Sequence, residues 1–464
     1  MKDYQRFCCG PGIALHTGLG NAVKTINQRE HQILIVGGGA AGLTVAHLLL
    51  RLRPGLDVAL LEPSPDHYYQ PGWTLVGGGL FQLSQTRRDQ GTLIPAGCTW
   101  IQAAATGFDP EHNLVRTSAD ATIGYQVLVM AAGLQCRWER IEGLTDALGS
   151  HGVCSNYSKD FAPYTWETIQ NFKGGTAIFT VPETPIKCGG APLKALFMAD
   201  DYFKAKSGVG VNSRVILATA GSSLFAVPAY ARVIKKVIQR RGIEVRLHCN
   251  LQQVHAKEQL AVFAVTDSDG GVSHQEIGFD MLHAVPPMTA PEVVQASPLA
   301  GEEPGGWVAA DQLTTQHPQY ANIFALGDVS GLPTSRTAGA VRGEAPVTAA
   351  NVLAYLDGLP LKAHYDGYTV CPLITGYGSV VMAEFDYTQK PVSSFLVDPT
   401  KERWSMWLMK TRLLPWLYWN RMIKGFPHEG AFLKPWAPLI HLLRLDYREP
   451  SGSSDDPVGP AGSC

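Results

Sequence analysis

The stretch that decides the fold is Gln32-Ile-Leu-Ile-Val-Gly-Gly-Gly-Ala-Ala-Gly42, which runs directly into the helical pattern Leu43–Leu52. Its apolar first half predicts a buried strand, and its glycines come where a strand turns into a helix. A strand, a glycine turn and a helix start in this order are typical of the first unit of a dinucleotide-binding domain.

Each small residue in this turn has a physical task. Gly37 permits the tight turn, Gly39 lets a pyrophosphate approach the backbone, and Gly42 allows helix and strand to pack closely. The first N–H groups of the helix face the phosphates. The predicted phosphate-binding residues are therefore Gly37, Gly39, Ala40, Ala41 and Gly42.

A second apolar run, 57–61, ends at Glu62, twenty residues after Gly42. A carboxylate at that place can accept hydrogen bonds from a ribose diol. A glycine fingerprint alone is often accidental, but the strand, helix, second strand and terminal acid together favour dinucleotide binding.

Two later segments indicate which dinucleotide binds. The run 126–133 is a strand that ends at a small turn, and 322–328 is a strand that ends in Gly-Asp. Both resemble motifs of flavoproteins with two dinucleotide-binding domains, in which the Gly-Asp carboxylate holds the ribityl chain. The resemblance implies that Asp328 contacts FAD and that a helix from about Thr337 points its N-terminus at the flavin. Alternatively, Asp328 is an ordinary turn or cap acid.

The region between these motifs predicts a second lobe of the same type, because 176–181, 192–206 and 214–220 read as strand, helix and strand. The turn 221–227 has one glycine and bulky side chains where a pyrophosphate would need room. The second lobe is therefore predicted not to bind a nicotinamide, and the electrons must come from another donor.

Cys188 lies in the segment 185–192, between a strand end and a helix start. The helix N-terminus and the cations Lys187 and Lys194 should lower its pKa and favour the thiolate. Cys371 comes much later, so a bridge between the two would join separate elements. The alternative for each cysteine is a small buried apolar residue.

The chain has 464 residues, of which 45% are hydrophobic and 17% charged, with a net charge of −2. This length is about three times that of a usual domain and predicts two or three lobes. The balanced charge argues against nucleic acid as a partner. The nine scattered cysteines have no metal-ligand spacing, so no metal site is predicted. The predicted fold class is α/β, with two Rossmann-like dinucleotide-binding domains and a C-terminal membrane-associating region.

That C-terminal region is rich in tryptophan and cations. Four of the ten tryptophans lie in 401–424, where Arg403 and Lys410 share a helical face and Pro415 divides the run into two short helices. Such a mixture is typical of a helix lying at a membrane surface, and the predicted contact spans 404–445. Alternatives are a buried helix pair or a dimer contact.

From about His16 to Ile440 the chain is similar to the sulfide:quinone oxidoreductase family, specifically its mitochondrial type. Long collinear segments carry the resemblance, namely 62–64, 69–76, 155–158, 188–192, 332–335, 365–369 and 383–387. The chain departs from the family pattern at Arg336, where a lysine is usual, and at 341–346, where a plainer helix is usual.

The resemblance implies that Cys188 and Cys371 are a redox pair flanking the flavin. It also implies that Gln70, Ala105 and Ala338 line the FAD site with Glu62 and Asp328. Hydrosulfide would attack a disulfide or trisulfide between the cysteines, leaving a persulfide on Cys371 and a thiolate on Cys188.

The resemblance implies partners and a place as well. Electrons would pass through FAD to a ubiquinone-type quinone, and the sulfur to a small acceptor such as glutathione or sulfite. A homodimer is compatible with it. The expected location is the mitochondrial inner membrane, peripherally, with a bacterial inner membrane as the alternative.

Two rival functions remain open. One is a type II NADH:quinone oxidoreductase, which the turn 221–227 disfavours; the other is a redox-inert flavoprotein scaffold.

The predicted domain organisation has five parts in chain order. They are a leader or flexible N-terminus at 1–30, an FAD-binding domain at 31–157 and 286–361, a second Rossmann-like domain at 158–285, a quinone and membrane region at 362–450, and a flexible tail at 451–464.

Overall fold

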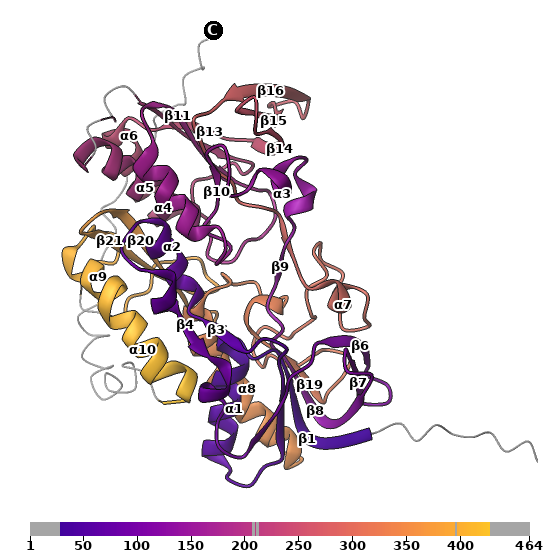
Figure 1. Cartoon of the computed structure of the whole chain (residues 1–464). Coiled ribbons are helices and arrows are strands. Elements are labelled where there is room, and N and C mark those ends of the chain that lie inside the picture. The colour runs from indigo at the N-terminus through magenta and orange to yellow at the C-terminus, as the bar shows by residue number, and fades with distance from the viewer. Residues whose placement is uncertain (1–27, 207–208, 210–212, 395–396, 427–464) are drawn as a thin grey trace, which may run out of the picture.

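The computed structural model describes residues 28–206, 209, 213–394 and 397–426. Two lobes follow one another along the long axis of the molecule, each built on a parallel sheet (Figure 1). Most of the predicted leader, the part of the predicted membrane contact from 427 to 445, and the predicted tail lie outside the described residues.

The first sheet has the order β5-β2-β1-β8-β7-β6, with β19 paired to β8. Strands β5, β2, β1, β8 and β19 run parallel. Its strands are β1 (Gln28–Val36), β2 (Val58–Leu61), β5 (Cys98–Ile101), β6 (Ala105–Asp109), β7 (Leu114–Thr117), β8 (Thr122–Met130) and β19 (Ile323–Ala325).

Strand β1 is buried on both faces, and Ile33, Leu34 and Ile35 are all 0% exposed. Helices α1 (Ala40–Leu52) and α8 (Ala338–Leu356) cover one face, while the other packs on a cluster containing Trp307. Because both faces are covered, the strand needs apolar side chains at successive positions, which explains its unbroken apolar run.

The parallel strands end at one edge of this sheet. Val36 pairs with both Leu61 and Met130, and Met130 pairs with Ala325. The turns that follow these strands therefore lie side by side, at the edge where ligands bind in such sheets.

The second sheet has the order β10-β17-β11-β12-β13, and all its strands are parallel. The strands are β10 (Val153–Cys154), β11 (Gly175–Val181), β12 (Ser213–Thr219), β13 (Glu244–Arg246) and β17 (Met281–His283). Helices α4 (Ala162–Asn171), α5 (Ala191–Asp201) and α6 (Pro228–Arg241) pack with them, and α5 continues into a π-helical turn, Tyr202–Lys206.

The strand order of this lobe repeats that of the first, because β13-β12-β11-β17 corresponds to β5-β2-β1-β8. Strand β11 is therefore the equivalent of β1, and the turn 182–190 is the equivalent of the Gly37–Gly42 turn. The sequence had suggested the turn after the later strand, at 221–227, as the place for a second fingerprint. Strand β10 belongs to the second sheet, whereas the predicted limits count it with the first domain; those limits stay a prediction.

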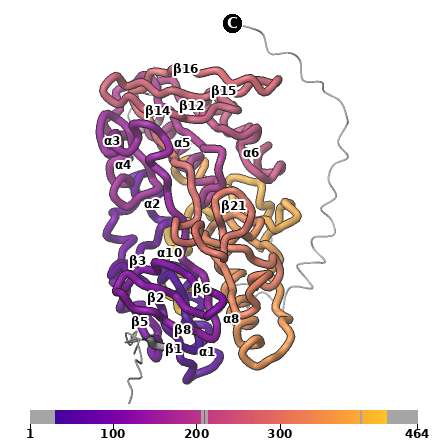
Figure 2. Tube along the Cα trace, turned by 90° about the vertical axis from the view of Figure 1, so that its right-hand side faces the viewer, coloured from indigo at the N-terminus to yellow at the C-terminus, as the bar shows by residue number. Residues whose placement is uncertain are grey.

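A hairpin of β20 (Thr369–Gly376) and β21 (Ser379–Phe385) lies between the two lobes (Figure 2). Beyond it come α9 (Trp404–Leu408), a π-helical turn at Met409–Leu413, and α10 (Leu414–Asn420). Pro415 lies in the first turn of α10 rather than between two helices, so the predicted division at that residue is wrong. The interruption is the π turn, and no helix in the described ranges is long and apolar enough to cross a membrane.

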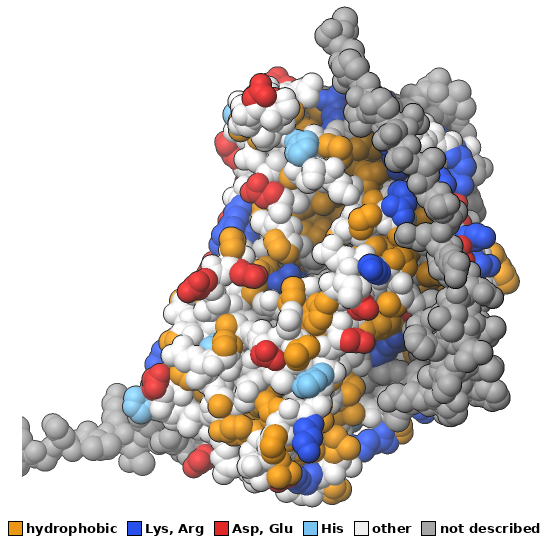
Figure 3. All heavy atoms as spheres, turned by 180° about the vertical axis from the view of Figure 1, so that it is seen from behind, with side chains coloured by type: hydrophobic (Ala, Val, Ile, Leu, Met, Phe, Trp, Pro, Cys, Tyr) orange, Lys and Arg blue, Asp and Glu red, His pale blue; other side chains and the backbone are white. Residues whose placement is uncertain are grey.

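The remaining elements are shorter or peripheral. A three-stranded antiparallel sheet closes the far end of the second lobe, and small elements connect the lobes. These are β3 (Asp66–Tyr68), α2 (Trp73–Gly77), β4 (Arg87–Asp89), β9 (Gln135–Cys136), α3 (Leu144–Ala147), β14 (Cys249–His255), β15 (Leu260–Thr266), β16 (Val272–Gly278), β18 (Met288–Thr289) and α7 (Glu292–Gln295). The face seen in Figure 3 mixes basic and acidic side chains.

Candidate active site

Cys188 and Cys371 come together although they lie on different elements. Cys188 is in the turn after β11 and Cys371 is on β20, and their Sγ atoms are 3.5 Å apart. A Cβ added at Gly190 would lie 2.6 Å from the Cys371 Sγ. Gly190, two residues after Cys188, thus leaves the space that the Cys371 sulfur occupies.

The backbone of Cys188 is in the left-handed region, with φ 53°. That conformation is uncommon for a residue with a side chain and costs about 1–3 kcal/mol. Two hydrogen bonds hold it: the Cys188 N–H donates to the Arg336 carbonyl (2.8 Å), and the Cys188 carbonyl accepts from the Ala191 N–H (2.8 Å). The surrounding structure therefore fixes the direction in which this thiol points.

The two sulfurs have opposite protonation preferences. The hydrogen bond from Cys371 lowers the pKa of Cys188 well below its ordinary value, and Lys194, whose Nζ lies 3.0 Å from the Cys188 Sγ, lowers it further. The pKa of Cys371 is raised well above its ordinary value by the same hydrogen bond and by burial. The ammonium group of Lys194, 3.0 Å from the Cys188 Sγ, thus favours the thiolate on Cys188 over the thiolate on Cys371.

Only one of the two predicted cations contacts the thiolate. Lys194 on α5 is 3% exposed and bonds it directly. Lys187 was also expected there, but its Nζ donates instead to Gln70 Oε1 (2.7 Å) and lies over the Trp73 ring. The backbone turn at Cys188 separates the two neighbouring side chains, so this expectation was wrong.

Lys410 is a second lysine near the sulfurs, which sequence reasoning missed. It was expected to share a helical face with Arg403 in a segment at a membrane surface, yet it is only 2% exposed and donates to the Pro71 carbonyl (3.1 Å). Burial, with Lys194 nearby, lowers its pKa to about 7, while the charge on Cys188 opposes that effect. The π turn packs against the segment before α2, so seven-residue helical spacing does not give the side chain's direction.

The glycine turn has the shape that a dinucleotide requires. A Cβ added at Gly37 would lie 2.3 Å from the Ala131 oxygen, and one at Gly42 would lie 1.9 Å from the Gly37 oxygen. At Gly39, by contrast, an added Cβ meets nothing within 4 Å. Gly37 and Gly42 are therefore needed for packing, whereas Gly39 borders the open space that a pyrophosphate would take.

Glu62 lies beside this turn, at the end of β2. Its Oε2 accepts from the Gly38 N–H (2.7 Å) and its Oε1 from the Ser64 N–H (2.8 Å). These hydrogen bonds hold the carboxylate at the edge where the glycine turn ends, as a ribose-binding acid requires.

Asp328 follows β19 and connects this edge to the cysteines. Burial raises the pKa of its carboxyl group, against the opposing effect of Lys187 and Arg336. The Arg336 side chain donates from Nε to the Asp328 carbonyl (3.0 Å), and the Arg336 carbonyl accepts from Cys188. The Gly-Asp turn and the reactive thiol are thus linked through one residue, Arg336.

The other predicted FAD residues lie around the same edge. Ala338 begins α8, whose N-terminus is capped by the Thr337 Oγ1 accepting from the Ala340 N–H (3.0 Å). Ala105 begins β6, and it packs with the cluster that contains Val36 and Leu61. Their contacts with FAD, like that of Gln70, stay predictions.

Two further buried titratable groups differ from these residues in chemistry. Cys154 is 0% exposed, and burial raises its pKa to about 12, so it is a poor nucleophile. Glu344, within the departure at 341–346, is 1% exposed and accepts from the Gly327 N–H (2.7 Å). Burial raises the pKa of Glu344 to about 7.

Comparison with known proteins places this site in a family. The family model described as pyridine nucleotide-disulphide oxidoreductase matches residues 31–344. The chain is 41% identical to the protein named sulfide:quinone oxidoreductase, mitochondrial, from Mus musculus, over 93% of each chain. The chain belongs to the mitochondrial sulfide:quinone oxidoreductase family. The expectation from the sequence motifs is confirmed, and with it the expectation of a flavoprotein.

Solved structures agree with the fold of this family. The sulfide:quinone oxidoreductase from the hyperthermophilic bacterium Aquifex aeolicus matches with a TM-score of 0.73 and 19% identity, over 88% of this chain and 95% of that one. NDH2 from Plasmodium falciparum in complex with NADH matches with a TM-score of 0.50 and 13% identity, over 66% of this chain and 65% of that one. By TM-score, the structure of NDH2 is therefore less similar to this chain than the structure of the sulfide:quinone oxidoreductase is.

Proposed function

We propose that this protein oxidises hydrogen sulfide with FAD as cofactor and passes the electrons to a membrane quinone. The observation that supports this most directly is the Cys188–Cys371 pair, with sulfurs 3.5 Å apart and Lys194 3.0 Å from the Cys188 sulfur. Two thiols that approach so closely can form and break a bond through sulfur.

The first step uses the oxidised pair. Hydrosulfide attacks the Cys371 sulfur of a Cys188–Cys371 disulfide; the new S–S bond leaves a persulfide on Cys371, and the broken bond leaves a thiolate on Cys188. If the bridge is a trisulfide, the same attack leaves a persulfide on Cys371 and expels Cys188 as a persulfide anion. Lys194 stabilises the Cys188 thiolate, because its ammonium group donates to the leaving sulfur. The pKa preferences of the two cysteines agree with this division, since Cys188 is the better leaving group.

The second step removes the sulfur. A small nucleophile such as glutathione or sulfite attacks the outer sulfur of the Cys371 persulfide, and Cys371 leaves as a thiolate that takes up a proton. Lys410, with a pKa of about 7, lies within electrostatic reach of both cysteines and can supply positive charge for the anions that enter. Bound FAD supplies a two-electron acceptor for re-oxidation of the pair, and quinone takes those electrons on.

The residues present fit FAD. The turn of Gly37, Gly39, Ala40, Ala41 and Gly42 would hold the pyrophosphate, Glu62 the ribose, and Asp328 the ribityl chain. Ala338 at the N-terminus of α8 would face the flavin ring.

Quinone is a membrane solute, and the segment α9–α10 offers a surface that could reach it. Trp404 is 64% exposed and Trp416 54%, and Leu408 and Leu413 are exposed beside them. Large apolar side chains so exposed favour an interfacial contact, as a peripheral protein of the mitochondrial inner membrane would make.

The test is anaerobic titration of the flavin-loaded enzyme. Sulfide should bleach the flavin absorbance at once, and a ubiquinone analogue should restore it. NADH should leave the absorbance unchanged. Bleaching by NADH and not by sulfide would contradict the proposal and favour the NADH-oxidising alternative.

A further inference from the structure

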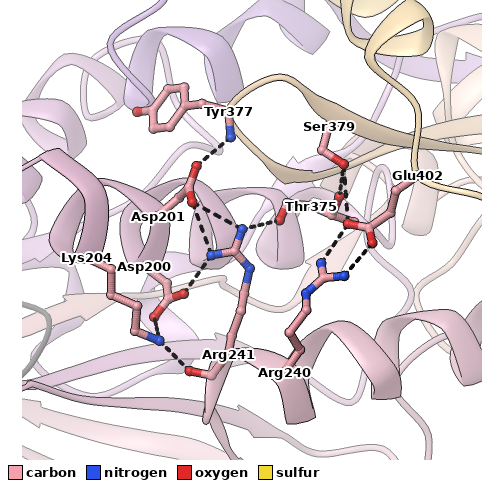
Figure 4. Close-up of polar contacts among 9 residues, drawn as sticks. All are labelled: Asp200, Asp201, Lys204, Arg240, Arg241, Thr375, Tyr377, Ser379 and Glu402. Atoms are coloured by element: carbon pink, nitrogen blue, oxygen red, sulfur yellow. Dashed lines mark hydrogen bonds and ion pairs between the residues drawn. The ribbon is translucent and has the colours of Figure 1, made fainter.

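A charged network joins the end of α5, the end of α6 and the β20–β21 turn (Figure 4). At its centre is Arg241, the last residue of α6. Its Nη1 donates to Asp200 Oδ2 (2.9 Å) and its Nη2 to the Thr375 carbonyl (2.7 Å), while Asp201 Oδ1 lies 3.3 Å from both nitrogens. One guanidinium group thus binds two carboxylates and the hairpin backbone together.

Asp201 binds the same hairpin directly. Its Oδ2 accepts from the Tyr377 N–H (2.8 Å), one residue beyond Gly376. A Cβ added at Gly376 would lie 2.4 Å from Arg241 Nη2, so the backbone of the hairpin turn packs closely on the guanidinium group and leaves no room for a side chain there. These contacts fix the C-terminal end of β20 to the C-terminal end of α5.

The other end of β20 is fixed as well. The Thr369 Oγ1 is 2.8 Å from the Oγ1 of Thr337, and Thr337 is the residue that caps α8. Cys371 lies between the two attachments, while α5 begins three residues after Cys188 and carries Lys194. The distance between the two sulfurs therefore depends on how β20 is held against α5.

Breaking this network costs free energy because its charged groups are largely buried, and the network is therefore rigid. The Asp200 side chain is 0% exposed and the Arg241 side chain 15% exposed, and Lys204 completes the pairing of Asp200 at 2.7 Å. Removing one partner of such a group leaves a buried charge without compensation. By comparison, the neighbouring Arg240–Glu402 pair in Figure 4 is largely exposed on its arginine side.

We propose that Arg241 and Asp201 are positioning residues for the Cys188–Cys371 pair, which hold β20 against α5 so that the two sulfurs stay in reacting distance. This inference rests on the redox role of the pair proposed above. Its physical reason is that effective concentrations of paired groups fall steeply when one of them is displaced by about 1 Å.

The experiment measures the effective concentration of the two thiols in the flavin-loaded enzyme. Each variant is equilibrated with mixtures of reduced and oxidised glutathione, and the Cys188–Cys371 bridge is quantified by mass analysis after acid quench. Asp201→Asn should keep the acceptor for Tyr377 and weaken the hold on Arg241. We expect it to lower the effective concentration at least tenfold and to raise the pH midpoint of Cys188 alkylation, because the hydrogen bond from Cys371 is lost.

The matched control is Arg214→Ala, which breaks an exposed ion pair with Glu244 (2.7 Å) in the same lobe. It should leave both readouts within twofold of the parent enzyme. If Asp201→Asn fails to fold by near-ultraviolet circular dichroism, Arg241→Lys is the second variant. The lysine keeps a positive charge beside Asp200, but its single ammonium nitrogen cannot also bond the Thr375 carbonyl as the guanidinium does. We expect the same tenfold fall in the effective concentration of the two thiols.

An unchanged thiol equilibrium and alkylation profile in a folded Asp201→Asn or Arg241→Lys variant would overturn the inference. The parent enzyme separates this outcome from failure of the proposed function. If sulfide does not bleach the parent flavin, the function fails; if it does and the variants match the parent, only the positioning role fails.

Discussion

The two lobes have the same strand order but different turns at the same place. After β1 the chain makes a short glycine turn bordered by Glu62, and Gly39 faces open space. After β11, the equivalent strand, the turn is longer and contains Cys188, and α5 supplies Lys194. The first turn suits a phosphate and the second suits a reactive sulfur.

This difference shows that one scaffold can place two kinds of chemistry. In both lobes the turn follows a parallel strand and precedes a helix, so it lies at the edge where the backbone can approach a ligand. The two turns differ in their side chains. Gly39 has none and leaves open space for a ligand, whereas Cys188 places a thiol in its own turn. Substitutions in each turn should therefore affect only the chemistry of that turn.

The largest expected effect comes from removing the thiol of the second turn. Cys188→Ser should abolish bleaching of the flavin by sulfide, with a rate loss of about a thousandfold or more, because a hydroxyl cannot form the sulfur bridge. Stopped-flow absorbance under anaerobic conditions measures it. The control is Cys98→Ser in β5, which should react as the parent does; a Cys188→Ser variant that bleaches at the parent rate would refute the assignment.

In the first turn, the two glycines Gly42 and Gly39 should respond differently to a methyl group. Gly42→Ala places a Cβ 1.9 Å from the Gly37 oxygen, and we expect a loss of about 2 kcal/mol or more in the free energy of unfolding. Gly39→Ala has space, so the fold should lose less than about 0.5 kcal/mol while bound flavin falls sharply. Denaturant unfolding and the ratio of flavin to protein absorbance distinguish them. Full flavin content in Gly39→Ala would mean that this space is not the pyrophosphate site.

Lys194 and Lys187, the two lysines that the sequence places near Cys188, should differ in their effect on its thiol. Lys194→Met should raise the pKa of the Cys188 thiol and slow its alkylation at pH 7 by about ten- to a hundredfold, because the neighbouring charge is lost. Lys187→Met is the matched control, since its ammonium group bonds Gln70 and not the sulfur. The rate of iodoacetamide reaction as a function of pH measures both. Equal shifts in the two variants would contradict the assignment of Lys194.

A pH-dependent effect on stability concerns Glu344, whose Oε2 accepts from the Gly327 N–H of the first lobe. Burial raises its pKa from 4.5 to about 7, so the folded protein binds this proton more tightly than the unfolded chain. The stability that this group contributes is full below pH 4.5 and is lost as pH rises towards 7, by at most about 3 kcal/mol.

Glu344→Gln should remove that loss, so the free energy of unfolding should become flatter between pH 4.5 and 7. Urea unfolding at several pH values measures it. Glu139→Gln, at an exposed carboxylate, serves as the control and should keep the parent's slope. A slope in Glu344→Gln equal to the parent's would show that Glu344 does not bind the proton.

Much of the first lobe could be predicted because its signals are local. The apolar run before Gly37, the glycine spacing and the acid at Glu62 are neighbours in sequence, and periodicity reads such patterns directly. The start of α8 at Ala338, capped by Thr337, agrees with the helix expected from about Thr337, but that expectation came from resemblance to flavoproteins. The meeting of Cys188 and Cys371 was different, since only resemblance to a family suggested it.

The failures share a physical cause. Lys410 was expected in a segment at a membrane surface because helical spacing put it with Arg403, but a π turn and packing against Pro71 bury it. Lys187 is adjacent to Cys188 in sequence, yet the positive φ of that cysteine separates the two side chains. Sequence distance does not fix direction where the backbone leaves regular geometry.

The sequence by itself determined the strands, the glycine turn and the residue types available for sulfur chemistry, because short-range sterics and hydrophobic periodicity act between near neighbours. Only the tertiary structure decided that β20 lies against α5, that Lys194 rather than Lys187 meets the thiolate, and that Arg241 fixes the hairpin. Those contacts join residues far apart in the chain, and their geometry depends on how whole elements pack.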